Sequence, residues 1–127
     1  MADINRGNRP LSPHLSIYRP QLTSVSSIMV RITGIASLGF VLLVVWWLLA
    51  AATSAEYFAI ADGLLRSWFG SLILLGATWA LWYHMLGRLR HVIWDFGYLV
   101  RIEASNKMAL GMFIGATVLT IITALVV

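Results

Sequence analysis

Residues 32–55 (ITGIASLGFVLLVVWWLLAAATSA) contain no charged side chain and lie between Arg31 and Glu56. A helix of about 20 mainly apolar residues crosses a hydrocarbon core about 30 Å thick. Two later stretches also contain no Asp, Glu, Lys or Arg: residues 67–87 (SWFGSLILLGATWALWYHMLG) and 108–127 (MALGMFIGATVLTIITALVV). The sequence therefore predicts an all-α transmembrane helical bundle with three membrane-spanning helices.

The composition supports a membrane environment. The 127 residues are 60% hydrophobic and only 11% charged, whereas soluble domains average about 25% charged residues. A chain this short can hardly bury so much apolar surface in its own core. We expect a single transmembrane domain over residues 1–127, with spans near 28–53, 64–89 and 107–127. The absence of cysteine excludes disulfides, iron–sulfur clusters and c-type haem in this chain.

The N-terminal segment, residues 1–20, lacks the continuous apolar run of a signal peptide and suits a mitochondrial transit peptide poorly. We therefore expect a protein of a bacterial cell inner membrane. Ser12 followed by Pro13 is typical of a helix start, and apolar side chains recur at one-turn spacing until Pro20. This pattern predicts a short N-terminal amphipathic interfacial helix. The alternative is an ordered arm that packs on a soluble partner.

The distribution of charge predicts the orientation. Arginines occur in the N-terminal segment, and residues 88–107 contain arginines and a lysine, whereas residues 53–63 contain Glu56 and Asp62 and no base. Cytoplasmic loops are enriched in Lys and Arg. We therefore expect the N-terminus to be cytoplasmic and the C-terminus periplasmic. The net charge of +4 is explained by this topology, so no nucleic-acid partner is expected.

His84 is the one ionisable imidazole within residues 67–87, the uncharged stretch of the second predicted span. Such residues are costly in a membrane and mark candidate functional sites. A neutral imidazole is a good axial ligand for haem iron. The alternative is a histidine near the interface that is hydrogen-bonded to a neighbouring helix, and position alone does not decide between the two.

His91 is a poor candidate for a second ligand from the same helix. It follows His84 by seven residues, which places it about 10.5 Å further along a helix axis. Two axial nitrogens on one iron are only about 4 Å apart. His14 lies in the N-terminal segment expected in the cytoplasm, so we do not expect it to reach an iron bound by His84. A six-coordinate iron would therefore take its second ligand from another chain.

Several basic residues near the predicted cytoplasmic surface are candidates for pairing with haem propionates: Arg31, Arg88, Arg90 and His91. The alternative for each arginine is ordinary positive charge on the cytoplasmic side with a snorkelling side chain.

Ser27 and Arg31 are four residues apart and share a helix face. A hydroxyl and a guanidinium at a membrane boundary could hydrogen-bond a quinone, unless the serine bonds its own helix. Asp95 is a candidate proton relay for quinone reduction. Its alternative role is a surface ion pair with Arg90 or Arg101.

Two long patterns resemble those of the cytochrome b membrane-anchor subunits of succinate dehydrogenase (respiratory complex II). The first begins Arg-Pro and ends Ser-x-x-His-Arg-x-Ser/Thr, and this chain has Arg9-Pro10 and later residues 27–33 (SIMVRIT). The second runs from a histidine to Asp-x-Gly and corresponds to residues 84–97 (HMLGRLRHVIWDFG). The resemblance covers the whole chain.

The resemblance implies an electron-transfer subunit that anchors a flavoprotein subunit and an iron–sulfur subunit together with a second small membrane anchor. FAD and the iron–sulfur clusters are expected only in the partner subunits, which pass electrons from succinate to ubiquinone. By position in the motifs, His84 is similar to the iron ligand of a haem b shared with the second anchor. Ser27 and Arg31 correspond to quinone-site residues. His91 and Asp95 are expected near the propionates or the proton path.

The chain departs from the family pattern at two positions. Val30 stands where the family usually has a histidine, and Arg88 stands where glycine or alanine is usual, with Gly87 one place earlier. We hypothesise that Arg88 supplies propionate charge that Val30 cannot.

The sequence is also compatible with three other functions. The chain could be a haem-free anchor of the same complex, the anchor of a related fumarate reductase, or a small structural membrane protein without a redox role.

Overall fold

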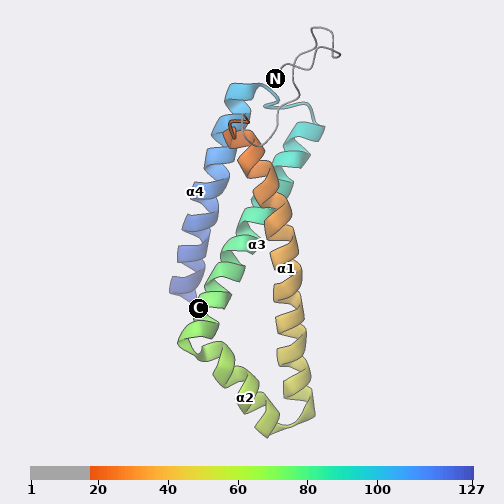
Figure 1. Ribbon diagram of the computed structural model, residues 1–127, viewed down its shortest axis with the longest axis vertical. Helices are drawn as coiled ribbons and strands as arrows, with labels where there is room; N and C mark the ends of the chain where they lie inside the picture. Colours follow the sequence, from red (N-terminus) through yellow and green to blue (C-terminus); the bar gives the residue numbers. More distant parts are fainter. Residues whose placement is uncertain (1–17) are drawn as a thin grey trace, which may run out of the picture.

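The computed structural model describes residues 18–127. The N-terminal segment, in which an interfacial helix and His14 were expected, falls largely in residues 1–17 and lies outside the described residues. The described part contains α1 (Leu22–Thr53), α2 (Ala55–Arg66), α3 (Trp68–Asp95) and α4 (Ile102–Val126). Figure 1 shows α1, α3 and α4 running along the molecule and α2 crossing obliquely at one end. The fold is all-α, as predicted.

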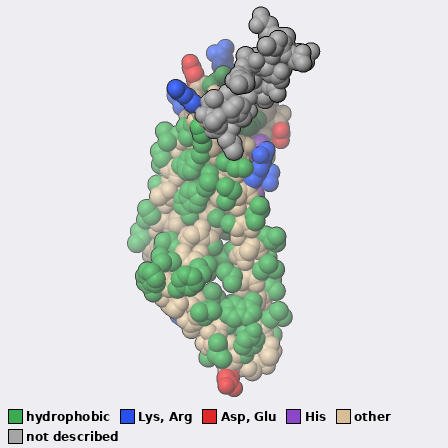
Figure 2. Space-filling view, viewed as in Figure 1, with side chains coloured by type: hydrophobic (Ala, Val, Ile, Leu, Met, Phe, Trp, Pro, Cys, Tyr) green, Lys and Arg blue, Asp and Glu red, His purple; other side chains and the backbone are tan. Residues whose placement is uncertain are grey.

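The number of long apolar helices agrees with the prediction. α1, α3 and α4 have 32, 28 and 25 residues, and each is long and apolar enough to cross a membrane. Residues 64–66 belong to α2, and α3 begins at Trp68. Figure 2 shows hydrophobic side chains covering the long flank of the molecule, with basic side chains gathered toward the end where α3 meets α4.

The connection between α1 and α3 is helical, whereas a short loop had been expected over residues 53–63. Ser54 caps α2, because its Oγ accepts a hydrogen bond from the backbone N–H of Tyr57 at 3.1 Å. Trp46 on α1 donates from Nε1 to the Tyr57 hydroxyl at 2.7 Å. Arg66 pairs with Asp62 one turn earlier at 2.7 Å. The Trp46–Tyr57 hydrogen bond links α2 to α1, as does a bond from Trp47 Nε1 to Asp62 at 3.3 Å.

α3 is the central helix of the bundle. It packs against both α1 and α4, which contact each other less extensively. The buried core lies where the three helices meet and contains Val30, Tyr83, Met112 and Ala116. Two tryptophans add polar links between α3 and α4: Trp79 Nε1 donates to Thr117 at 3.2 Å and Trp82 Nε1 to Thr123 at 3.1 Å.

Gly97 ends α3 and directs the chain toward α4. Its φ is +77°, a left-handed conformation that glycine adopts without steric cost. The Gly97 N–H donates to the carbonyl of Trp94 at 2.8 Å, which satisfies part of the helix end. The turn therefore fixes the end of α3 at Asp95, whose side chain is exposed.

Candidate functional site

His84 lies in the middle of α3 and contacts the backbone of α1. Its Nδ1 is 2.9 Å from the carbonyl oxygen of Val30. Its Nε2 is 3.2 Å from the Nε of Arg88, one turn further along α3. The imidazole is half-buried, so one edge meets α1 and the other is accessible beside Arg88.

The two contacts define the protonation of the ring. The Val30 carbonyl can only accept a hydrogen bond, so Nδ1 must carry the proton. The Arg88 Nε–H can only donate, so Nε2 must present its lone pair. Both requirements describe the same neutral tautomer. A ring whose Nδ1–H is held by a carbonyl and whose Nε2 presents its lone pair on the opposite edge is typical of metal-ligating histidines.

Two glycines allow the close approach of α1 and α3 at this level. A Cβ on Gly34 would lie 2.8 Å from the Cε1 of His84, closer than atoms can pack. A Cβ on Gly87 would overlap the Cγ2 of Val30, so Val30 fills the space that Gly87 leaves. The residue at position 30 therefore faces the core of the bundle, with 4% of its surface exposed.

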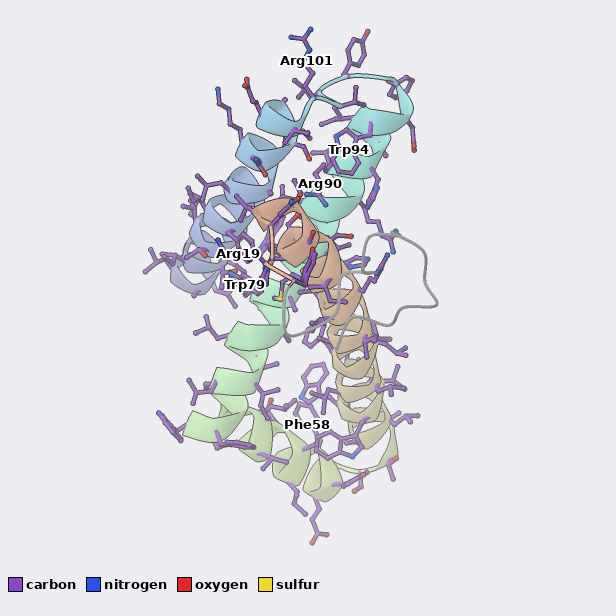
Figure 3. The ribbon with its side chains drawn as sticks, turned by 45° about the horizontal axis from the view of Figure 1, so that its top comes forward. Arg19, Phe58, Trp79, Arg90, Trp94 and Arg101 are labelled. Carbon is purple, nitrogen blue, oxygen red and sulfur yellow. The ribbon has the colours of Figure 1, made fainter. Side chains whose placement is uncertain are left out.

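Arg90 is buried between the helices, with an exposed fraction of 2%. Its Nη1 donates to Ser26 Oγ on α1 at 2.6 Å, and its guanidinium lies 4.6 Å from the centre of the Trp94 ring. Figure 3 shows Arg90 beside the first turns of α1, with Trp94 further along α3. Among residues 18–127, Arg90 Nε and Trp94 Nε1 have no hydrogen-bond partner. The snorkelling role considered for the arginines does not apply to Arg90.

Within the described residues, none of the remaining predicted residues forms a hydrogen bond with His84. Ser27 is half-buried near the start of α1 and Arg31 is exposed. His91 is half-buried and packs edge-on against Trp94, with ring centres 5.4 Å apart. Asp95 is exposed at the end of α3, and within the described residues it forms no ion pair with Arg90 or Arg101. The structure therefore brings Arg88 into contact with His84.

The sequence interpretation missed the parts of the site that depend on helix rotation: Ser26, the Val30 carbonyl, Gly34, Tyr83 and the burial of Arg90. Tyr83 is fully buried, and its hydroxyl donates to the Ser26 carbonyl at 3.4 Å. The available signal was helical spacing, because Tyr83, Gly87 and Arg90 recur at intervals of four and three along one face of α3.

These features define a class: a small helical membrane protein that holds one neutral histidine against a backbone carbonyl within its spans. Residues 5–123 match the family described as succinate dehydrogenase/fumarate reductase transmembrane subunit. The chain belongs to this family.

Named relatives cover nearly the whole chain. The succinate dehydrogenase cytochrome b556 subunit of Paracoccus denitrificans is 52% identical over 126 residues, covering 99% of this chain and 97% of the relative. That of Rickettsia conorii is 34% identical, covering 90% and 89%. The cytochrome b560 subunit of Chondrus crispus is 31% identical, covering 90% and 92%. The chain is thus similar to membrane subunits of succinate dehydrogenase from bacteria and from an alga.

Proposed function

We propose that this chain is a membrane-anchor cytochrome b subunit of succinate dehydrogenase that holds haem b through His84 and contributes to ubiquinone reduction. The observation that carries the proposal is the pair of contacts at His84. The Nδ1–H is bound to the Val30 carbonyl, which orients Nε2 as a ligand for iron. The names of the relatives, cytochrome b556 and b560, support a b-type haem.

The residues around His84 fit such a group. Nε2 of His84 would bind the iron in place of its present contact with Arg88. Arg88 is exposed and flexible enough to turn toward a propionate, and Arg31 and His91 are further candidates at the same end of the bundle. When bound, haem b supplies a one-electron carrier within the membrane. The second axial histidine would come from the second anchor subunit, since His91 is about 10.5 Å from His84 along the helix.

Quinone binding is assigned to the start of α1. Ser27 and Arg31 lie one turn apart, so their hydroxyl and guanidinium can donate to the same carbonyl compound at the membrane boundary. Asp95 is exposed at the neighbouring end of α3 and can exchange protons with water. The flavoprotein subunit with its FAD and the iron–sulfur subunit would dock on this end, where the electrons enter.

The charges support an orientation in the bacterial inner membrane with the α3–α4 connection in the cytoplasm. Arg88, Arg101 and Lys107 are exposed around this end. At the opposite end the base in the described part is Arg66, and it is neutralised by Asp62. Lys and Arg are enriched on the cytoplasmic side. The C-terminus would then be periplasmic.

Purification of the tagged chain from native membranes tests the proposed function. We expect it to bring a flavoprotein, an iron–sulfur protein and a second small membrane protein, and to show a b-type α-band on reduction with succinate. Succinate should reduce ubiquinone in the same sample. A sample with flavin but no b-type band would indicate a haem-free anchor. A chain that purifies without flavin would contradict a role in succinate dehydrogenase.

Replacing Ser27 with alanine should raise the KM for ubiquinone by about two- to tenfold, because one hydrogen bond contributes about 0.5–1.5 kcal/mol. Succinate oxidation by a soluble dye that accepts electrons from the flavoprotein should not change. Ser37→Ala is the matched control, because the Ser37 hydroxyl already donates to the Thr33 carbonyl within α1. An unchanged KM in Ser27→Ala would remove Ser27 from the quinone site.

A further inference from the structure

Gly34 is the point at which α1 touches the ring of His84. A Cβ at this position would lie 2.8 Å from Cε1, 3.2 Å from Nδ1 and 3.8 Å from Nε2. Carbon atoms at van der Waals contact are about 3.5–4.0 Å apart. The neighbouring atoms belong to a rigid aromatic ring, so the ring as a whole would have to move to admit a methyl group.

The same contact determines what Nδ1 can reach. Val30 precedes Gly34 by one helical turn, so the Val30 carbonyl points along α1 toward the Gly34 N–H. The imidazole reaches this carbonyl from the side, at 2.9 Å, by lying against the bare Cα of Gly34. A side chain at position 34 would push the ring away from α1 and lengthen the Nδ1–H bond to the Val30 carbonyl.

We propose that Gly34 is a positioning residue that sets the orientation and the Nδ1–H tautomer of His84 as an iron ligand. The inference rests on the proposed function, since it concerns how the ligand is presented. Without the Val30 carbonyl, the neutral imidazole can place its proton on either nitrogen and can rotate about its side-chain bonds. Only the Nδ1–H form leaves Nε2 able to bind iron. Gly34 thus acts on the iron through His84 without touching it.

Two other glycines, Gly87 and Gly39, distinguish a positioning role of Gly34 from a general role in helix packing. Gly87 is where α3 meets the side chain of Val30, so a methyl group there disturbs helix packing before it reaches the imidazole. Gly39 is also on α1, and within residues 18–127 a Cβ there would have no atom within 4 Å beyond the adjacent backbone of its own helix. Gly39→Ala is therefore a matched control for the same substitution on the same helix.

The test compares the purified complex of the wild type, Gly34→Ala and Gly39→Ala. For each we would measure the haem-to-flavin ratio, the rate of haem loss to an apo-protein acceptor, and the electron paramagnetic resonance signal of the ferric haem. Loss of a hydrogen-bond partner of a metal ligand weakens binding by about 10–100-fold. In Gly34→Ala we expect haem loss at least about tenfold faster and a shifted ferric signal. Gly39→Ala should match the wild type.

A Gly34→Ala complex with wild-type haem retention and an unchanged ferric signal would overturn the inference. If the Gly34→Ala complex does not assemble, the inference is tested on the wild-type complex, by measuring exchange of the His84 Nδ1 proton. Pulsed resonance of ¹⁵N-histidine-labelled complex in H₂O and D₂O reports exchange of the Nδ1 proton. A proton held by the Val30 carbonyl exchanges slowly, and one that exchanges as fast as a solvent-exposed imidazole proton would overturn the inference. A wild-type complex without any b-type band would instead contradict the proposed function.

Discussion

Replacing His84 with leucine is expected to abolish or alter the b-type α-band of the purified complex. Leucine fills a similar space in the helix but has no lone pair, so iron would lose the ligand that this chain supplies. Arg88 would also lose the acceptor of its present hydrogen bond. A reduced-minus-oxidised visible spectrum, normalised to flavin, measures the effect. The flavin content itself should change little, because the hydrogen bonds of the ring within residues 18–127 go to the Val30 carbonyl and to Arg88 and not to the α3–α4 connection.

Met85→Leu is the matched control for this experiment. Met85 follows His84 on α3, is exposed, and carries a thioether that can also bind haem iron. Its replacement should leave the spectrum unchanged. An unchanged band in His84→Leu would move the ligand to another residue or chain, and a band lost only in Met85→Leu would assign it to the thioether.

Replacing Gly87 with leucine is expected to disrupt the bundle itself. Even a Cβ at Gly87 would overlap Val30 Cγ2, and it would lie 3.2 Å from the Cε of Met112 on α4. Overpacking by smaller groups typically costs about 1–3 kcal/mol, and leucine adds a whole branched side chain where three helices meet. We expect most of the flavoprotein to be recovered in the soluble fraction. Succinate oxidation with a dye as electron acceptor, measured separately in the membrane and soluble fractions, reports this distribution.

A compensating substitution distinguishes a local clash from a general loss of helix packing. Gly87→Ala should lower the thermal stability of the complex, and Val30→Ala in the same chain should restore part of it by removing the overlapping methyl groups. Gly76→Ala on the same helix should have little effect, because in the described part of the chain its Cβ would meet no atom within 4 Å beyond the adjacent helix backbone. Equal losses in Gly76→Ala and Gly87→Ala would contradict the assigned contact.

The long helices could be predicted because absence of charge is a local property of the sequence. α2 could not be predicted in the same way, since Glu56 and Asp62 made residues 53–63 resemble an exposed loop. In the structure both residues belong to α2, where Asp62 accepts a hydrogen bond from Trp47 and pairs with Arg66. The cap of this helix depends on the contact between Ser54 and Tyr57. A search for capping residues as well as charge would have favoured this helix.

The candidate site was predictable only in part, for a geometric reason. An ionisable side chain within a span is visible in the sequence, so His84 could be selected as a candidate ligand. Its hydrogen-bond acceptor is a main-chain carbonyl 54 residues away, which no side-chain pattern reveals. Arg88 and Arg90 are separated by about 200° around a helix, so one is exposed and the other buried. Which of them faces the bundle is decided by packing.

The quinone and propionate residues Ser27, Arg31, His91 and Asp95 stay predictions. Their partners in the proposed complex would be other subunits and ligands, so the fold of one chain does not determine their contacts. The family membership gives the kind of complex in which those contacts would form.

The burial of Arg90 has a consequence for how the protein enters the membrane during synthesis. On membrane-insertion scales, an arginine at the centre of a helix costs about 2.5–3.5 kcal/mol. α3 alone would offer Arg90 only the Trp94 ring, whereas Ser26 comes from α1. Since α1 emerges from the ribosome first, Ser26 is already in the bilayer when Arg90 arrives. Because α1 precedes α3 along the chain, α3 enters the membrane with a polar partner already present for its charge.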